Sequence, residues 1–249
     1  MDHALLIFIA GFVAGAMNAI AGGGTFLALP VLIFTGVPAL NANASCTVAL
    51  FPGALASSIA YRRDFKRFDD ISMPLLLVIS ISGGIAGALL LLFTPHEAFD
   101  HLVAWLLLLG TLTFAFGARL GVILRKYVRI GPRSLLICQF VLCVYGGYFG
   151  AAIGIMMLAL WSLMGFTDLR AMNAAKTLYV GSTNSVAAVC FLFAGLIAAI
   201  PTLIMLMAGI LGGWAGAQLV RHLDPRYLRI GINIINFSMT AWFFYRAAR

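Results

Sequence analysis

Residues 4–35 have the sequence ALLIFIAGFVAGAMNAIAGGGTFLALPVLIFT, which contains no charged side chain. Residues 4–21 form an apolar run of about the 20 residues that a helix needs to cross a bilayer. Residues 26–35 form a second apolar run, which is too short to cross as a helix of normal length. Between the runs lie Gly22-Gly23-Gly24-Thr25, and consecutive glycines destabilise a helix strongly. We therefore expect a hairpin or a broken helix at residues 22–25.

The composition of the whole chain is typical of a membrane protein. Of its 249 residues, 63% are hydrophobic and 10% are charged, and the mean hydropathy is +1.04. A soluble domain is about 45–50% apolar and about 25% charged. The apolar surface excludes secreted enzymes, nucleic-acid-binding domains and disordered scaffolds. At roughly 20 residues a span, the chain holds about eight or nine membrane elements and no separate soluble domain. We expect an all-α, polytopic helical bundle in the membrane.

A second break is predicted in the other half of the chain. The segment Gly150-Ala151-Ala152-Ile153-Gly154 precedes a short apolar run at 156–165. Non-helical backbone is tolerated at membrane depth only where protein or a water-filled cavity covers it. We therefore expect broken or re-entrant helices whose breaks, at 22–25 and 153–156, meet near the middle of the bilayer and mark a site.

The order of features repeats along the chain. Asn43-Ala44-Ser45-Cys46-Thr47 matches Asn173-Ala174-Ala175-Lys176-Thr177 at an offset of 130 residues. Each half then contains a broken hairpin, a long helix and two more helices. We predict an N-terminal transmembrane repeat at 1–124 and a C-terminal transmembrane repeat at 134–249.

Charge placement predicts how the two halves sit in the membrane. Loop 62–70 carries four basic residues, whereas its counterpart near 194–197 carries no charge. Loop 94–101 has no Lys or Arg, whereas its counterpart at 220–229 has three arginines. The basic loops thus change sides between the halves, as expected for inverted-topology repeats. Because basic loops stay in the cytoplasm, we expect 62–70, 119–133 and 220–229 to be cytoplasmic and both termini periplasmic, in the inner (plasma) membrane.

One ionisable residue, Lys176, lies inside an apolar run. An ionisable group within the membrane is a functional candidate, and a bound anion would favour its charged form. The alternative is snorkelling of the side chain to the cytoplasmic interface. Lys176 follows Arg170 by six residues, which is about 9 Å of helix rise. Polar neighbours on the same segment favour the site, and the sequence leaves both interpretations open.

The starts of the two short helices add a second kind of anion donor. Backbone N–H groups at a helix N-terminus lie at the positive end of the helix dipole and bind anions without a cation. Two such helices facing one another near the midplane would bind an anionic head group together with Lys176. The candidate substrate-binding residues are Gly23, Gly24, Thr25, Asn43, Ser45, Thr47, Gly154, Met156, Asn173, Lys176, Thr177 and Asn184.

The apolar runs contain no Asp, Glu or His. A carboxylate proton relay, a catalytic triad and a metal centre all depend on such residues. We therefore expect no enzymatic activity, no metal and no cofactor.

Several motifs make the chain resemble the TauE/SafE sulfite-exporter family. They are GAMNAIAGGGT at 15–25, LP at 29–30, GVP at 36–38, NANAS at 41–45, GGYFG at 146–150 and NAAKT at 173–177. The resemblance covers nearly the whole chain, although the glycine cluster of the second half is reduced to Gly150 and Gly154. It implies a bacterial-type inner-membrane transporter for sulfite, organosulfonates or related sulfur anions.

Together these features predict a secondary transporter of a small sulfur-containing anion, sulfite or an organosulfonate. It would export the anion by alternating access at the interface of the two inverted repeats. The expected partners are the small anion and the lipid bilayer but not nucleic acid, and the sequence leaves a homodimer open. Two alternatives remain: a membrane scaffold or assembly factor whose cavity is only structural, and an anion channel.

Overall fold

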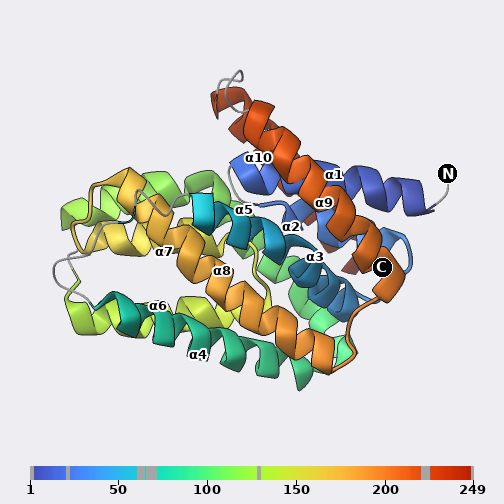
Figure 1. Cartoon of the computed structure of the whole chain (residues 1–249), viewed down its shortest axis with the longest axis horizontal. Coiled ribbons are helices and arrows are strands. Elements are labelled where there is room, and N and C mark those ends of the chain that lie inside the picture. Colours follow the sequence, from blue (N-terminus) through green and yellow to red (C-terminus); the bar gives the residue numbers. More distant parts are fainter. Residues whose placement is uncertain are drawn as a thin grey trace.

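The computed structural model describes residues 3–20, 23–60, 65, 72–127, 130–219 and 225–247, and within these ranges the chain is helical, with no β-strand. The helices are α1 (His3–Ile20), α2 (Thr25–Phe34), α3 (Ala39–Ala60), α4 (Met73–Leu92), α5 (His96–Tyr127), α6 (Pro132–Tyr148), α7 (Ile153–Leu163), α8 (Leu169–Phe193), α9 (Ala199–Leu219) and α10 (Pro225–Ala247). Figure 1 shows them packed into one bundle.

Two of the helices are short, as the sequence predicts. Helix α2 has 10 residues and α7 has 11, against roughly 20 for a membrane span.

Near the predicted first break Gly23 has a φ of 121°, and Gly22 lies outside the described residues. The prediction of a second break at 153–156 is wrong, because α7 already begins at Ile153. The break precedes it, where Gly150 and Ala152 have φ angles of 80° and 60°, which a right-handed helix does not accommodate.

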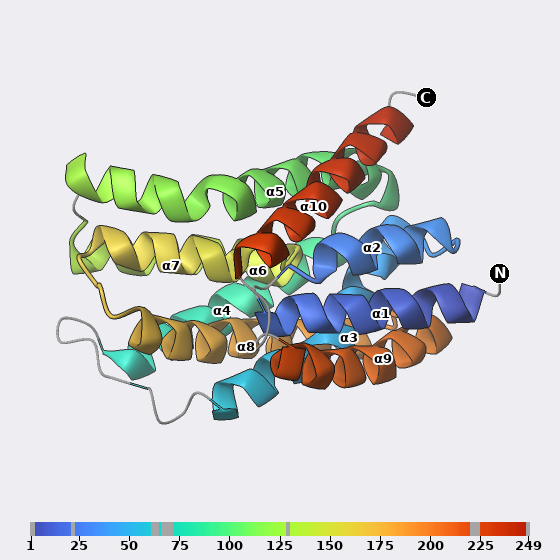
Figure 2. The same ribbon diagram turned by 90° about the horizontal axis from the view of Figure 1, so that it is seen from above.

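The two short helices begin near the middle of the bundle and run outward in opposite directions (Figure 2). Helix α1 approaches the middle from one end, and α2 returns towards that end. In the same way, α6 approaches the middle from the opposite end, and α7 returns towards that opposite end (Figure 2). The start of α1 and the end of α10 lie at one end of the bundle in both views (Figures 1 and 2).

Glycines allow the long helices to pack with their backbones close together. Helix α1 lies along α9, where a methyl group built on Gly11 would lie 2.9 Å from the carbonyl oxygen of Met205. Helix α4 lies along α6, where a methyl group on Gly83 would lie 2.6 Å from the Cβ atom of Cys143. Small residues at these positions are typical of helix pairs in membranes.

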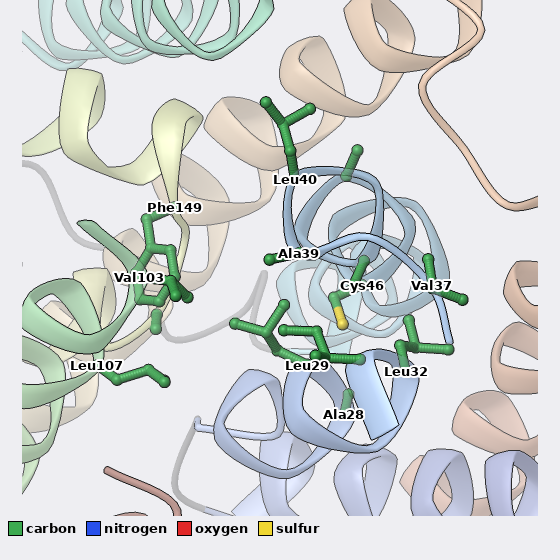
Figure 3. Packing of buried hydrophobic residues seen from close by; sticks show 14 of the residues in the cluster. Ala28, Leu29, Leu32, Val37, Ala39, Leu40, Cys46, Val103, Leu107 and Phe149 are labelled. Atoms are coloured by element: carbon green, nitrogen blue, oxygen red, sulfur yellow. The ribbon is translucent and has the colours of Figure 1, made fainter. Parts of the chain in front are cut away.

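The largest apolar cluster joins the two halves of the chain. Figure 3 shows Leu29 and Leu32 of α2 close to Cys46 of α3, and Leu107 of α5 near Phe149. Leu29, Leu32, Cys46, Leu107 and Phe149 are all completely buried. Since Phe149 lies in the second break, protein covers the non-helical backbone there.

Polar groups are buried and large apolar side chains are exposed, which is the reverse of a soluble protein. Trp105 and Trp214 are 63% and 69% exposed, whereas Gln139 is completely buried. Gln139 accepts a hydrogen bond from Trp161 at 3.1 Å and donates one to Ser80 at 3.3 Å, so it links α6 to α7 and α4. Helix α4 and residues His96–Gly117 of α5 are long and apolar enough to cross a membrane.

Two predicted loops are wrong in extent. Helix α5 begins at His96, within the predicted loop 94–101, and it continues to Tyr127, within the predicted connection 119–133. The basic side chains Arg125 and Lys126 lie in its last turn, where cations stabilise the negative end of the helix dipole. Loop 62–70 lies outside the described residues except for Phe65, and so do residues 220–224 before α10.

Candidate functional site

The first break is capped by a side chain from the preceding helix. The amide oxygen of Asn18 accepts hydrogen bonds from the backbone N–H groups of Gly23, at 3.0 Å, and Gly24, at 2.7 Å. The N–H of Gly24 is therefore not free for an anion, contrary to the expectation from the sequence. Asn18 was missed, although an asparagine near the end of an apolar run was a usable signal.

Gly24 is required for the close approach of α2 to α1. A methyl group on Gly24 would lie 3.0 Å from the Cγ atom of Asn18 and closer still to the carbonyl oxygen of Ala14. The start of α2 therefore depends on glycine at this position, independently of any ligand.

The second break joins the C-terminus of α6 to the N-terminus of α7. The N–H groups of Phe149 and Gly150 both donate to the carbonyl oxygen of Tyr145, at 2.8 and 3.4 Å. The N–H of Met156 donates to the carbonyl oxygen of Ala152 at 3.2 Å, so it is used within α7 and is not free. The positive end of α7 lies one turn earlier, at Ile153 and Gly154.

Lys176 of α8 lies across this start of α7. A methyl group on Gly154 would lie 3.0 Å from Cδ and 3.4 Å from Cγ of Lys176, so glycine leaves room for the lysine stem. The Nζ atom of Lys176 donates a hydrogen bond of 2.9 Å to the Oδ1 atom of Asn173. Three predicted site residues, Gly154, Asn173 and Lys176, are thus brought together from two helices.

Two further asparagines lie at the second break. Asn43 of α3 is completely buried, and its Nδ2 atom donates to the carbonyl oxygen of Tyr148 at 2.9 Å. The Oδ1 atom of Asn184 lies 3.9 Å from the position of a methyl group on Gly150. The Oδ1 atoms of Asn43 and Asn184 are both buried and accept no hydrogen bond from the described part of the chain.

Three of the remaining polar candidates form hydrogen bonds with backbone groups. Ser45 accepts a hydrogen bond of 3.0 Å from the N–H of Ala198, just before α9. The hydroxyl groups of Thr47 and Thr177 donate to carbonyl oxygens of their own helices, those of Asn43 and Ala174. Thr25 begins α2, and it is partly buried.

The starts of the two short helices both lie against one apolar cluster, which contains Phe114 of α5. A methyl group on Gly23 would lie 3.2 Å from the Phe114 ring, and Phe26 packs edge-on against this ring with a centroid distance of 6.4 Å. Ile155, in the first turn of α7, belongs to the same apolar cluster as Phe114. Nothing in the sequence distinguished Phe114 from the other phenylalanines.

The chain is similar to known membrane proteins over almost its full length. The family model described as "Sulfite exporter TauE/SafE" matches residues 7–243. A "Probable membrane transporter protein" of Haemophilus influenzae is 32% identical over 247 residues, covering 97% of this chain and 94% of the relative.

Two more relatives carry similar names. "Probable membrane transporter protein ORF9" of Sinorhizobium sp is 28% identical, covering 94% of this chain and 89% of the relative. "Probable membrane transporter protein YfcA" of Escherichia coli K12 is 28% identical, covering 96% of this chain and 89% of the relative. With a family match over nearly the whole chain and an apolar exterior around buried polar groups, the protein belongs to the sulfite exporter TauE/SafE family and is a membrane transporter.

Proposed function

We propose that the protein is a secondary transporter that exports a small sulfur-containing anion, sulfite or an organosulfonate. The observation that carries the proposal is the position of Lys176 across Gly154 in the first turn of α7. A helix N-terminus and an ammonium group both attract an anion, and charge-assisted hydrogen bonds are about twice as strong as neutral ones. A single ammonium among neutral donors suits the compact, singly charged head group of a sulfonate.

We further propose that residues 1–124 and 134–249 are inverted repeats that exchange between two arrangements. The pairing of α1 with α9 and of α6 with α4 supports this, because each pair joins the first helix of one half to the fourth helix of the other. The hydroxyl groups of Thr111 and Thr240 lie 2.9 Å apart. These residues are 129 positions apart, close to the offset of the sequence repeat, and equivalent residues touch one another only near a two-fold axis.

The short helices α2 and α7 would then be re-entrant hairpins, each with its start at the centre of the membrane. Gly23 lies against Phe114, and Ile155 packs against the apolar cluster that contains Phe114, which supports a meeting point there. In alternating access one repeat moves against the other around such a fixed central site.

For the orientation, we propose an inner-membrane protein with both termini periplasmic and the basic loops cytoplasmic. The start of α1 and the end of α10 lie at one end of the bundle, as this orientation requires (Figure 2). Single cysteines placed at residue 249 and in loop 62–70 of a cysteine-free variant should react oppositely. Membrane-impermeant thiol reagents should label residue 249 from outside and loop 62–70 only after lysis. Protection of residue 249 from the outside reagent would contradict the orientation.

Transport can be tested in proteoliposomes that contain the purified full-length protein. Uptake should saturate for sulfite or a sulfonate and should be much weaker for sulfate and carboxylates of similar size. Flux that rises linearly with concentration would favour a channel, and no flux of any anion would favour a scaffold. Assays started from each side of oriented vesicles would test export against import.

Gly154→Ala should lower anion affinity by about three- to tenfold, equivalent to about 0.7–1.4 kcal/mol, with the fold intact. The new methyl group would displace the flexible stem of Lys176, whereas alanine favours the helix itself. Anion binding and the melting temperature of the purified variant measure the two effects separately. Gly231→Ala is the matched control, since a methyl group there meets nothing within 4 Å in α10. Unchanged anion affinity in Gly154→Ala would place the anion elsewhere.

A further inference from the structure

The second break contains an excess of buried hydrogen-bond acceptors. The Nδ2 atom of Asn43 is fixed by its bond to Tyr148, so its unpartnered Oδ1 atom cannot be exchanged for a donor by flipping the amide. The Oδ1 atom of Asn184, from another helix, is also buried and accepts no hydrogen bond within the described ranges. Burying such groups without partners costs free energy, so a missing partner is expected.

The end of α6 adds backbone acceptors at the same place. Helix α6 ends at Tyr148, and the N–H groups of Phe149 and Gly150 both turn back to the carbonyl oxygen of Tyr145. No backbone N–H of the described segments reaches the carbonyl oxygens of Gly146 or Gly147. These oxygens form the negative end of the helix dipole, which attracts cations.

We propose that the α6–α7 break binds a monovalent alkali cation, with sodium as the best fit, through the side-chain oxygens of Asn43 and Asn184 and the carbonyl oxygens of Gly146 and Gly147 in the last turn of α6. All of these groups are neutral oxygen acceptors, which suit a hard cation and not an anion. Divalent Ca²⁺ and Mg²⁺ favour sites with carboxylates, and the apolar runs around the break contain none. Unwound carbonyls and half-helix C-termini are known ligands of coupling ions in transporters.

The cation and the proposed anion would flank one short break. The cation lies at the end of α6, and the anion lies at the start of α7 beside Lys176. Asn184 follows Lys176 by eight residues of α8, about 12 Å of helix rise. The bound anion would screen the cation from the ammonium group, so each ion should tighten the binding of the other. This coupling rests on the proposed function, whereas the cation site itself does not.

The site can be tested on the purified full-length protein without any transport assay. Sodium chloride would replace choline chloride from 1 to 100 mM at constant ionic strength, with potassium chloride in parallel, while thermal unfolding is followed. A ligand that binds only the folded state raises the stability of the protein by mass action. We expect a saturable rise in melting temperature of about 3 °C or more with sodium, and a smaller rise with potassium. Equal curves in sodium and choline would overturn the proposal, because water would then satisfy the acceptors.

Variants at Asn184 separate a bound cation from a general salt effect. Asn184→Leu keeps most of the side-chain volume and should abolish the sodium-dependent rise. Asn184→Asp should lower the half-saturating sodium concentration by about tenfold, because an ionised ligand binds a cation more strongly. Asn236→Leu is the matched control, since Asn236 is a buried asparagine of α10 whose amide atoms also have no partner in the described structure. Its sodium response should equal that of the wild type.

A full sodium response in Asn184→Leu, or its loss in Asn236→Leu, would contradict the proposed ligands. Should Asn184→Leu fail to fold, the opposite shift in Asn184→Asp still decides the question. Sodium-dependent stabilisation without anion flux would refute the proposed transport and leave the cation site standing. Anion flux in choline equal to that in sodium, with no stabilisation by sodium, would refute the cation site and leave transport standing.

Discussion

Replacing Lys176 by alanine should weaken anion binding by roughly 10- to 150-fold while the protein stays folded. A charge-assisted contact of this kind is worth about 1.5–3 kcal/mol. The Lys176 side chain lies over the first turn of α7 and bonds to Asn173, so its removal takes away the only formal positive charge at this helix start within the described structure. Anion binding to purified, monodisperse Lys176→Ala protein measures the effect.

Lys176→Arg serves as the charge-preserving comparison. It should restore binding only in part, because the planar guanidinium group has a different reach and geometry from an ammonium group. Residual binding in Lys176→Ala is expected from the backbone N–H groups at the start of α7. If both variants keep an affinity within about twofold of the wild type, Lys176 snorkels to the interface, and the anion is held by backbone and amide groups alone.

Gly24→Ala should have the largest effect on folding. The added methyl group would clash with the carbonyl oxygen of Ala14, a backbone atom, and with the amide of Asn18, which is held by its bonds to Gly23 and Gly24. Relief of the clash would pull α2 from α1 and would break the bonds from Asn18 to Gly23 and Gly24. Overpacking costs about 1–3 kcal/mol, and buried N–H groups without partners cost about 1–3 kcal/mol each. The expected loss of stability is therefore about 2–5 kcal/mol.

The yield of monodisperse protein and its melting temperature measure this loss. Gly231→Ala again provides the comparison, since its methyl group would enter open space in a helix and should stabilise by about 0.5–1 kcal/mol. Equal stability of Gly24→Ala and the wild type would show that α2 can move away from α1 without loss. In that case the close packing at the first break would not define the fold.

The sequence by itself determined the features that depend on local chemistry. Hydropathy predicted an all-helical membrane protein, and glycine's poor helix propensity placed the first break beside Gly23. The length of the apolar runs predicted that α2 and α7 would be short. These features follow from a few neighbouring residues, and the described structure contains them. The second break was misplaced by about a turn, because the left-handed conformation of Ala152 has no signature in the residue type.

Only the tertiary structure decided which polar groups meet. Ser45 was grouped with the site because it neighbours Asn43, yet it binds Ala198, 153 residues away. Asn43 binds Tyr148 across 105 residues, and Lys176 lies against Gly154 of a different helix. Contacts between such distant residues depend on how closely whole helices pack. That closeness is set where glycine backbones touch between distant segments, and a linear pattern of apolar residues does not specify those contacts.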